Sequence, residues 1–340
     1  MSGAGVDPER LIEELGGRSE GPARRATSLR PPSAPAPDAA VVAHDAADVA
    51  LAMRTPGTHD LAWLVVPTDV EVAPRLPDGS VRPPLVRHAD PRRVLAYLSR
   101  VFDVEPRPPL GVHPTAVIAP DATVGARVRI GPHVVVGAGA ELGDDCTIDA
   151  GSVIGDGCRL GAGTRLFPRV VLYPGVTLGR EVRVHAGAVL GSDGFGYAAG
   201  TDRPEKIHHL GGLRIGDRVE IGANACIDRG TLGDTTVGSD TKIDTLSYVA
   251  HNVRIGRACL LVGFAAIGGS AVLEDGVVLG AAVAVRDHVT IGAGARLAAR
   301  SAVSKDVPAG ATYMGEPARP RRDWVRERHR LRTLLRDEER

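Results

Sequence analysis

An aliphatic residue recurs every six positions through most of the chain beyond its first third. The recurrence forms three runs, at residues 112–190, 215–227 and 237–303, separated by two breaks in phase. A small residue or valine often stands two positions before each aliphatic residue, and glycine often follows it. Such hexads are typical of a parallel β-helix, in which each unit supplies a short strand and a turn. We therefore predict a mainly β solenoid with the aliphatic side chains in its interior.

Three hexads complete one triangular coil of about 18 residues, stacked about 4.8 Å from the next coil. The composition fits this narrow prism, because 42 Gly and 25 Pro accompany only four Phe, two Trp and five Tyr. Glycine supplies turn conformations that other residues reach only with strain. Cys146, Cys158 and Cys259 occupy the small position of their hexads. We expect these thiols to pack in the interior rather than to bind metal or to undergo redox chemistry.

Residues 1–105 lack the hexad and predict a small α/β domain. Aspartate followed by proline begins each of two expected helices, over residues 7–16 and 90–102. Short aliphatic runs at residues 41–42 and 61–66 predict strands between them. The chain thus begins with a unit of a different architecture from the solenoid.

The β-helix is expected to occupy residues 106–314, followed by a basic helical tail over residues 315–340. Within that tail, residues 319–336 contain eight arginines against two acidic residues. Such a helix is either a solvated surface element or a docking surface for an acidic partner.

Charge is balanced, with 41 basic and 41 acidic residues, which argues against a protein that coats nucleic acid. The sequence has no stretch of 18 apolar residues, so no membrane span is expected. The first residues show neither the basic nor the apolar segment of a secretory signal. Four cysteines are too few for a disulfide scaffold. Together these features predict a cytoplasmic protein.

The two phase breaks are expected to carry the chemistry, because insertions in a solenoid usually lie on a binding face. The first break, residues 191–214, contains Phe195 and Tyr197 in a chain that is poor in aromatic residues. The second break covers residues 229–234. Histidine is the natural general base near neutral pH, so the histidines near these breaks are the first candidates for catalysis.

Coil arithmetic singles out two histidines in the last run. His251 stands two positions after Val249, and His288 stands three after Val285, two coils further on. The two histidines should therefore lie nearly in line, about 10 Å apart along the axis. Gly269, in the coil between them, should lie directly against His251, where its backbone N–H could face a developing oxyanion. Taken alone, His251 is either this catalytic base or an exposed turn residue.

Four segments around the breaks carry a resemblance to a known family. They resemble the UDP-3-O-acylglucosamine N-acyltransferases of lipid A biosynthesis, and the resemblance covers roughly residues 110–335. The segments are Leu190–Tyr197, Ile215–Gly222, Ile227–Gly230 and Val249–Val253.

The resemblance implies a homotrimer of left-handed β-helices with active sites in grooves between subunits. The donor would be a 3-hydroxyacyl thioester on the phosphopantetheine of acyl carrier protein, and the acceptor the 2-amino group of UDP-3-O-acylglucosamine. Neither a further cofactor nor a metal is implied. The first domain would bind uridine, and the basic tail would dock acyl carrier protein.

The resemblance also implies roles for particular residues. His251 would be the general base, His288 a second functional histidine, and the backbone N–H of Gly269 an oxyanion donor. The implied substrate contacts are Asp193, Phe195, Tyr197, Asp244, Tyr248 and Asn252.

The chain departs from the family pattern at three places. Thr245 stands where the family often has asparagine, and Tyr248 stands where it often has glutamine, so contacts with the pantetheine arm are affected. In the first domain, the nearest match to the family's uridine-binding stretch, residues 38–42, has no aromatic residue to stack on uracil.

Three alternative functions stay open on the sequence alone. The first is a related sugar acyl- or acetyltransferase that uses coenzyme A, and the second is a non-catalytic paralogue. The third is a metal-dependent hydratase of the same fold, which is disfavoured because His251 and His288 lie too far apart for one zinc ion. In the second break, Asp228 and Arg229 form either a surface ion pair or part of the acceptor groove.

Overall fold

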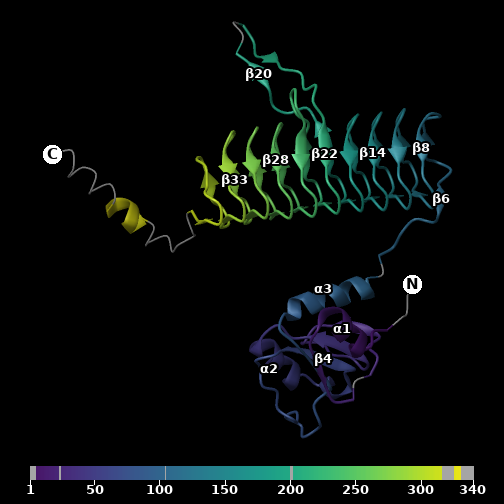
Figure 1. The fold of residues 1–340 in the computed structure, drawn as a ribbon, viewed down its shortest axis with the longest axis vertical. Helices are drawn as coiled ribbons and strands as arrows, with labels where there is room; N and C mark the ends of the chain where they lie inside the picture. The colour runs from purple at the N-terminus through teal and green to yellow at the C-terminus, as the bar shows by residue number, and fades with distance from the viewer. Residues whose placement is uncertain (1–4, 23, 104, 200–201, 316–324, 331–340) are drawn as a thin grey trace. The chain divides into compact units, whose positions relative to one another are not determined.

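A computed structural model describes residues 5–22, 24–103, 105–199, 202–315 and 325–330 of the chain (Figure 1). The chain divides into two compact units, the first ending at Pro106 and the second beginning at Arg107. Among the described residues, no helix has the length and apolar character needed to cross a membrane.

The first unit is a five-stranded sheet with three α-helices. The sheet order is β1-β5-β4-β3-β2, in which β2 to β5 run parallel and β1 pairs antiparallel with β5. The elements are α1 (Pro8–Leu15), β1 (Arg18–Glu20), β2 (Ser28–Arg30), β3 (Ala39–Val42), α2 (Ala46–Arg54), the 3-10 turn η1 (Thr58–Asp60), β4 (Trp63–Pro67), β5 (Leu85–His88) and α3 (Pro91–Phe102).

Both helices expected in this unit are present, and so are the strands expected near residues 41–42 and 61–66. Asp90 caps α3 by accepting a hydrogen bond from the backbone N–H of Arg93, whereas the side chain of Asp7 caps nothing at α1. The patterns did not predict α2 or the three remaining strands. Each of those strands has only three or four residues, which is too short for an alternating pattern to stand out.

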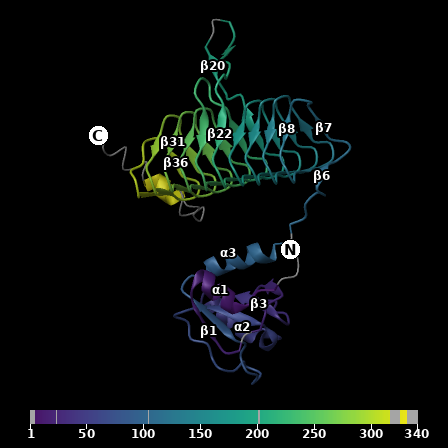
Figure 2. The same ribbon diagram turned by 45° about the vertical axis from the view of Figure 1, so that its right-hand side comes forward.

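The second unit is a left-handed parallel β-helix, as predicted, and its described strands form sheets of ten, nine and eleven strands (Figures 1 and 2). The first sheet contains β7 (Val117–Ile118), β10 (Val135–Val136), β13 (Val153–Ile154), β16 (Val171–Leu172), β19 (Val189–Ser192), β24 (Cys226–Asp228), β27 (Tyr248–Val249), β30 (Ala266–Ile267), β33 (Ala284–Val285) and β36 (Ala302–Val303). The second contains β8 (Thr123–Val124), β11 (Glu141–Leu142), β14 (Arg159–Leu160), β17 (Thr177–Leu178), β22 (Leu213–Ile215), β25 (Thr235–Val237), β28 (Arg254–Ile255), β31 (Val272–Leu273) and β34 (Thr290–Ile291). The third contains β6 (Gly111–Val112), β9 (Arg129–Ile130), β12 (Thr147–Ile148), β15 (Arg165–Leu166), β18 (Arg183–Val184), β23 (Glu220–Ile221), β26 (Lys242–Ile243), β29 (Leu260–Leu261), β32 (Val278–Leu279), β35 (Arg296–Leu297) and β37 (Thr312–Tyr313).

The hexad aliphatic residues fill the interior of the prism. From Ile130 to Val303 they are buried, and only the first few, at the open end of the helix, are partly or largely exposed. The interior thiols behave as expected, since Cys146, Cys158 and Cys259 are fully buried. Burial raises the pKa of Cys146 to about 11 and also raises the pKa of the other two, so these thiols stay protonated and inert at neutral pH.

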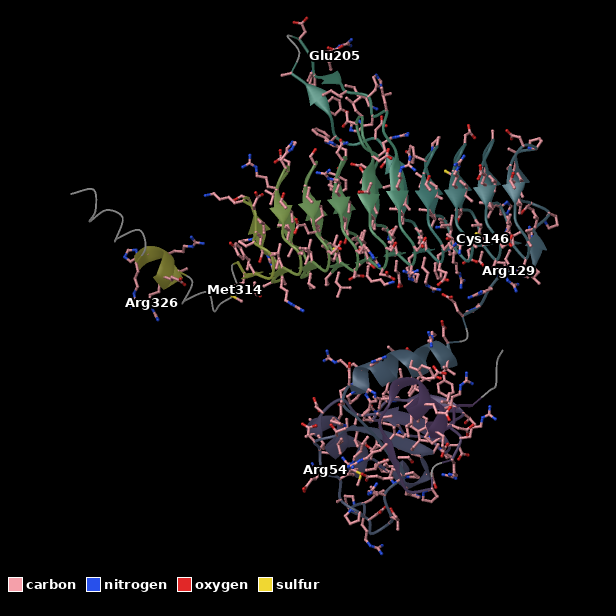
Figure 3. The ribbon with its side chains drawn as sticks, viewed as in Figure 1. Arg54, Arg129, Cys146, Glu205, Met314 and Arg326 are labelled. Carbon is pink, nitrogen blue, oxygen red and sulfur yellow. The ribbon has the colours of Figure 1, made fainter. Side chains whose placement is uncertain are left out.

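The first phase break leaves the prism as a hairpin. Its strands are β20 (Tyr197–Ala198) and β21 (Glu205–Lys206), which pair antiparallel. The hairpin projects away from the coils in two views, and Glu205 marks its outer part (Figures 1 to 3). Near the C-terminus of the chain, residues 325–330 are helical, while the remainder of the helix expected over residues 319–336 lies outside the described residues.

Candidate active site

His251 lies where the chain turns from β27 in the first sheet to β28 in the second. Its strand is in register with the following coils, because Val249 pairs with Ile267 and Ile267 pairs with Val285. The coil arithmetic for this corner is therefore correct, and the residue 18 positions after His251, Gly269, stacks directly on it.

Gly269 lies against the imidazole of His251, as the coil arithmetic predicts. A Cβ atom at position 269 would be 2.9 Å from both Cε1 and Nε2 of that ring. The backbone N–H of Gly269 donates to no acceptor within the part of the chain that the structure describes. This corner thus offers the imidazole of a half-buried histidine beside bare backbone that carries an unused hydrogen-bond donor.

His288 is exposed and stands one position out of line with His251. It belongs to the column formed by Asn252 and Ser270, and these three residues share a left-handed turn conformation with φ between 58° and 60°. Backbone bonds connect the corner, since Ser270 N donates to His251 O at 2.9 Å and His288 N donates to Gly269 O at 3.0 Å. The two histidines therefore occupy one corner, with a full coil between them.

A network around Asn252 sets the tautomer of His251. The Asn252 amide donates from Nδ2 to Gly233 O at 3.0 Å, and its Oδ1 accepts from Thr231 N at 3.0 Å. Oδ1 also lies 3.0 Å from Nδ1 of His251, so Nδ1 must carry the proton. The lone pair of the neutral ring is then on Nε2, the nitrogen that faces Gly269. In this structure Asn252, expected to contact substrate, supports the histidine.

The base of the hairpin closes over the opposite edge of His251. The rings of His209 and His251 meet edge to face, with centroids 5.2 Å apart and an interplanar angle of 70°. Gly194 fits between them, because a Cβ there would lie 2.8 Å from Cδ2 of His251 and 2.9 Å from Nε2 of His209. The first phase break therefore contributes directly to the corner that carries His251.

A buried carboxylate lies near this pair. Asp228 is only 4% exposed and accepts hydrogen bonds from Ser192 Oγ at 2.9 Å and from Tyr248 Oη at 2.6 Å. Burial raises the pKa of Asp228, although the two hydroxyl donors and the neighbouring His209 and His251 partly oppose the rise. The interpretation of Asp228 as a surface ion-pair partner is wrong, because it is buried among these groups. Burial and the bond to Asp228 also raise the pKa of Tyr248, a residue that remains 38% exposed.

We expect Asp228→Asn to change how stability depends on pH. Because the folded-state pKa is raised, the ionised carboxylate destabilises the native state, and stability is lost as pH rises from the usual value near 3.8 through the folded pKa. Asparagine does not titrate, so the stability of the variant relative to the native protein should rise across this window and level off above it. Each unit of pKa elevation corresponds to about 1.4 kcal/mol.

Chemical denaturation of both proteins at fixed concentration, from pH 4 to 7, measures this difference. A difference that stays constant with pH, or that falls as pH rises, would contradict the assignment of a raised pKa to Asp228.

Three of the expected substrate contacts lie at the base of the hairpin and on its first strand. Asp193 forms an ion pair with Lys206 at 2.6 Å, and this bond lowers the pKa of the carboxyl. Phe195 and Tyr197 pack edge to face at 5.0 Å and are 83% and 48% exposed. Together with neighbouring residues of the hairpin they line an apolar pocket of about 400 Å³. These side chains present an apolar surface beside the His251 corner.

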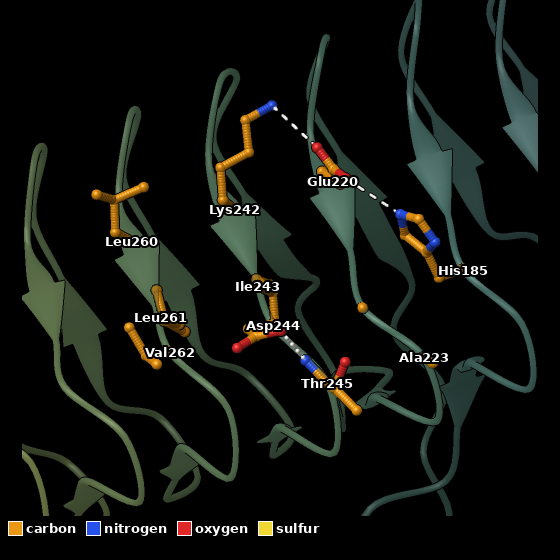
Figure 4. A pocket seen from close by; sticks show the side chains of 11 residues that line it. His185, Glu220, Ala223, Lys242, Ile243, Asp244, Thr245, Leu260, Leu261 and Val262 are labelled. Carbon is orange, nitrogen blue, oxygen red and sulfur yellow. Dashed lines mark hydrogen bonds and ion pairs between the residues drawn. The ribbon is translucent and has the colours of Figure 1, made fainter. Parts of the chain in front are cut away.

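Asp244 lies on a different corner from His251, where the chain turns from the third sheet to the first. Its carboxylate accepts hydrogen bonds from the backbone N–H groups of Thr245 at 2.7 Å and Gly263 at 3.0 Å, and these bonds keep its pKa low. It lines a cavity of about 510 Å³ together with His185 and Glu220, which are hydrogen-bonded to each other (Figure 4). Within one chain, Asp244 and His251 therefore belong to separate surfaces.

The sequence patterns missed the contact of His209 with His251 and the buried position of Asp228. The place where the first insertion starts could have indicated this contact. Ser192 pairs with Asp228, and the next strand of that sheet ends two residues before His251. The base of any insertion after residue 192 must therefore start near this corner. No group of three or more metal-binding side chains occurs among the described residues.

Comparison with known proteins identifies the repeat and a homologous segment. A family model described as a hexapeptide repeat of succinyl-transferase matches residues 122–155, 153–192 and 212–244. Proteins named UDP-3-O-acylglucosamine N-acyltransferase are 46% identical over 137 residues in Caulobacter sp. (strain K31) and 53% identical over 138 residues in Rhizobium meliloti (strain 1021). These matches cover 40% of this chain and 40% and 39% of the two relatives, so they span about two fifths of each relative's length.

A solved structure extends the comparison to most of the β-helix. The Arabidopsis UDP-N-acetylglucosamine acyltransferase aligns with a TM-score of 0.51 and 27% identity, covering 61% of this chain and 72% of that one. The chain is therefore a hexapeptide-repeat protein, and over about two fifths of its length it is homologous to the UDP-3-O-acylglucosamine N-acyltransferases, as its sequence motifs indicate.

Proposed function

We propose that this protein is an N-acyltransferase that moves a 3-hydroxyacyl chain from acyl carrier protein to the 2-amino group of UDP-3-O-acylglucosamine. The observation that carries the proposal is the corner at His251. There an imidazole with a lone pair on Nε2 packs against the backbone of Gly269. Homology to proteins named for this acceptor supports the choice of sugar nucleotide.

In this proposal His251 acts as the general base. The amine nitrogen attacks the thioester carbonyl, and Nε2 of His251 takes the proton that the nitrogen loses. Asn252 holds Nδ1–H and keeps the lone pair on the reacting side of the ring. The developing oxyanion accepts a hydrogen bond from the N–H of Gly269. When the intermediate collapses, the C–S bond breaks, an amide forms, and the thiolate leaves with the proton from His251.

The substrate contacts of the proposal extend over both surfaces described above. The exposed aromatic pair Phe195 and Tyr197 lies on the hairpin beside His251 and suits the acceptor. The cavity at Asp244 suits the donor arm if the active protein is a homotrimer, because a groove between subunits can join two corners that one chain keeps apart. The trimer is part of the proposal.

Acyl carrier protein is the proposed donor because the tail is strongly basic. In the described helical segment, residues 325–330, three of the six side chains are arginines and all six are exposed. An acidic carrier would be attracted to such a surface. The proposal assigns no cofactor beyond the phosphopantetheine of the donor, and it keeps uridine binding as the role of the first domain.

Mass spectrometry of reaction products tests the function directly. The full chain is mixed with UDP-3-O-acylglucosamine and, in parallel, with 3-hydroxyacyl thioesters of acyl carrier protein or of coenzyme A. The proposal expects an amide-linked product from the carrier thioester. If product formed only with the coenzyme A thioester, the donor would be coenzyme A rather than acyl carrier protein. If neither thioester gave product, the proposal would be overturned.

A further inference from the structure

His209 is a buried histidine for which the proposed reaction has no role so far. It follows the hairpin strand β21 and is only 5% exposed. The exposed His208 immediately precedes it. The buried ring of His209 makes edge contact with the ring of His251 and so lies at the proposed catalytic corner.

The hydrogen bond of His209 fixes which nitrogen can accept. Its Nδ1 lies 3.1 Å from the carbonyl oxygen of Ile207, and a carbonyl only accepts, so Nδ1 carries the proton. Nε2 of the neutral ring then presents a lone pair. This nitrogen is buried and has no hydrogen-bond partner among the described residues. Buried polar atoms are nearly always satisfied, so an unpartnered acceptor in a candidate active site suggests a ligand that donates to it.

Gly194 brings the hairpin backbone against both this nitrogen and the ring of His251. A Cβ at position 194 would meet Nε2 of His209 at 2.9 Å and Cδ2 of His251 at 2.8 Å. A Cβ at position 196 would meet Cε1 of His209 at 3.0 Å. Because Gly194 and Gly196 have no side chains, the hairpin backbone can close over both rings, and Nε2 faces the same strip of backbone as the edge of His251.

We infer that Nε2 of His209 accepts a hydrogen bond from a free hydroxyl of the acceptor sugar and thereby positions that sugar beside His251. This inference rests on the proposed function. In UDP-3-O-acylglucosamine, position 1 carries the nucleotide, position 2 the reacting amine and position 3 the acyl ester. The hydroxyls at positions 4 and 6 are therefore the donors available to His209. Its role is binding and selection of the acceptor, while His251 remains the base.

The test measures acceptor binding without any donor, by titration calorimetry with the full chain. The ligands are UDP-3-O-acylglucosamine and its 4-deoxy and 6-deoxy analogues. The variants are His209→Phe, which keeps an aromatic ring without the acceptor nitrogen, His209→Gln, which restores an acceptor oxygen, and the matched control His208→Phe on the exposed neighbour. Thermal unfolding verifies that each variant folds.

We expect His209→Phe to raise the Kd of the natural acceptor about 10-fold, the size of one lost hydrogen bond. One deoxy analogue should bind the native protein about 10-fold more weakly and should lose nothing further in His209→Phe. His209→Gln should recover part of the loss, and His208→Phe should bind as the native protein does.

Two results would overturn the inference. The first is an equal effect of His209→Phe on all three ligands, which would mean that His209 only packs against His251. The second is failure of the native protein to bind the natural acceptor. Acceptor binding with the expected pattern but without acyl transfer would instead reject the proposed reaction and leave the hydroxyl contact standing.

Discussion

His251→Ala should lower kcat for acyl transfer by about 10²–10⁴-fold while the β-helix stays folded, because a positioned general base contributes rate enhancement of this order. His251 is half-buried at a turn, and its backbone carbonyl, which accepts from Ser270 N, is unchanged by the substitution. The loss should therefore appear in catalysis rather than in stability. Single-turnover transfer from acyl carrier protein thioester, with thermal unfolding measured alongside, tests both parts.

His133→Ala is a matched control for this experiment. His133 also occupies a turn of the β-helix, with φ 56°, and belongs to an early coil far along the chain from the proposed site. Its removal should leave kcat within about 3-fold of the native value, the scale of surface substitutions away from special features. A His251→Ala variant with turnover similar to that control would show that another group removes the proton.

The architecture of the second unit could be predicted almost completely, because one physical requirement repeats in every coil. Each inward position must be filled by an aliphatic side chain that packs on its equivalents above and below, so the period of the sequence is the period of the structure. The pairing of Val249 with Ile267 follows directly. The same arithmetic correctly predicts that Gly269 lies against His251.

The arithmetic also holds for the neighbouring column of this corner, but it does not extend to the inserted hairpin. His288 stacks on Asn252 and Ser270, 36 and 18 residues before it, as its place three residues after Val285 predicts. The path of the hairpin follows no period at all. The contact of His209 with His251 depends on how the loop closes. The need for glycine at position 194 becomes visible only when both rings are in place.

The first unit was predicted only in outline, because its strands are short and three of them, β3, β4 and β5, are buried along their whole length. Strand β3 illustrates the difficulty, since all four of its residues are buried and no alternation marks the strand in the sequence. Its burial also bears on nucleotide binding. The stretch that best matched the family's uridine-binding segment consists largely of this strand, so Ala39–Val42 serve the core of the sheet and offer no surface to a base.

Substitution of Gly269, the glycine that packs against the proposed base, is the second change expected to reduce kcat strongly. Gly269→Ala should reduce kcat about 100-fold, although it adds only one methyl group. The added Cβ would lie 2.9 Å from Cε1 and Nε2 of His251, closer than real contacts allow, and the imidazole is the group able to move. A displaced ring loses its bond from Nδ1 to Asn252 and points Nε2 away from the amine. A shift of about 1 Å in a catalytic group is enough for a loss of this size.

Backbone strain is not the reason for the expected loss, because Gly269 is not in the left-handed region. Gly233→Ala provides the matched control, since it adds the same methyl group near the Asn252 network but meets its nearest neighbour, Asn252 Nδ2, only at 4.0 Å. That control should keep near-native kcat. The combination of Gly269→Ala with His251→Ala should be no slower than His251→Ala alone, because the methyl group acts by displacing a ring that is already absent. Additive losses would mean that position 269 acts on the oxyanion or the substrate independently of the histidine.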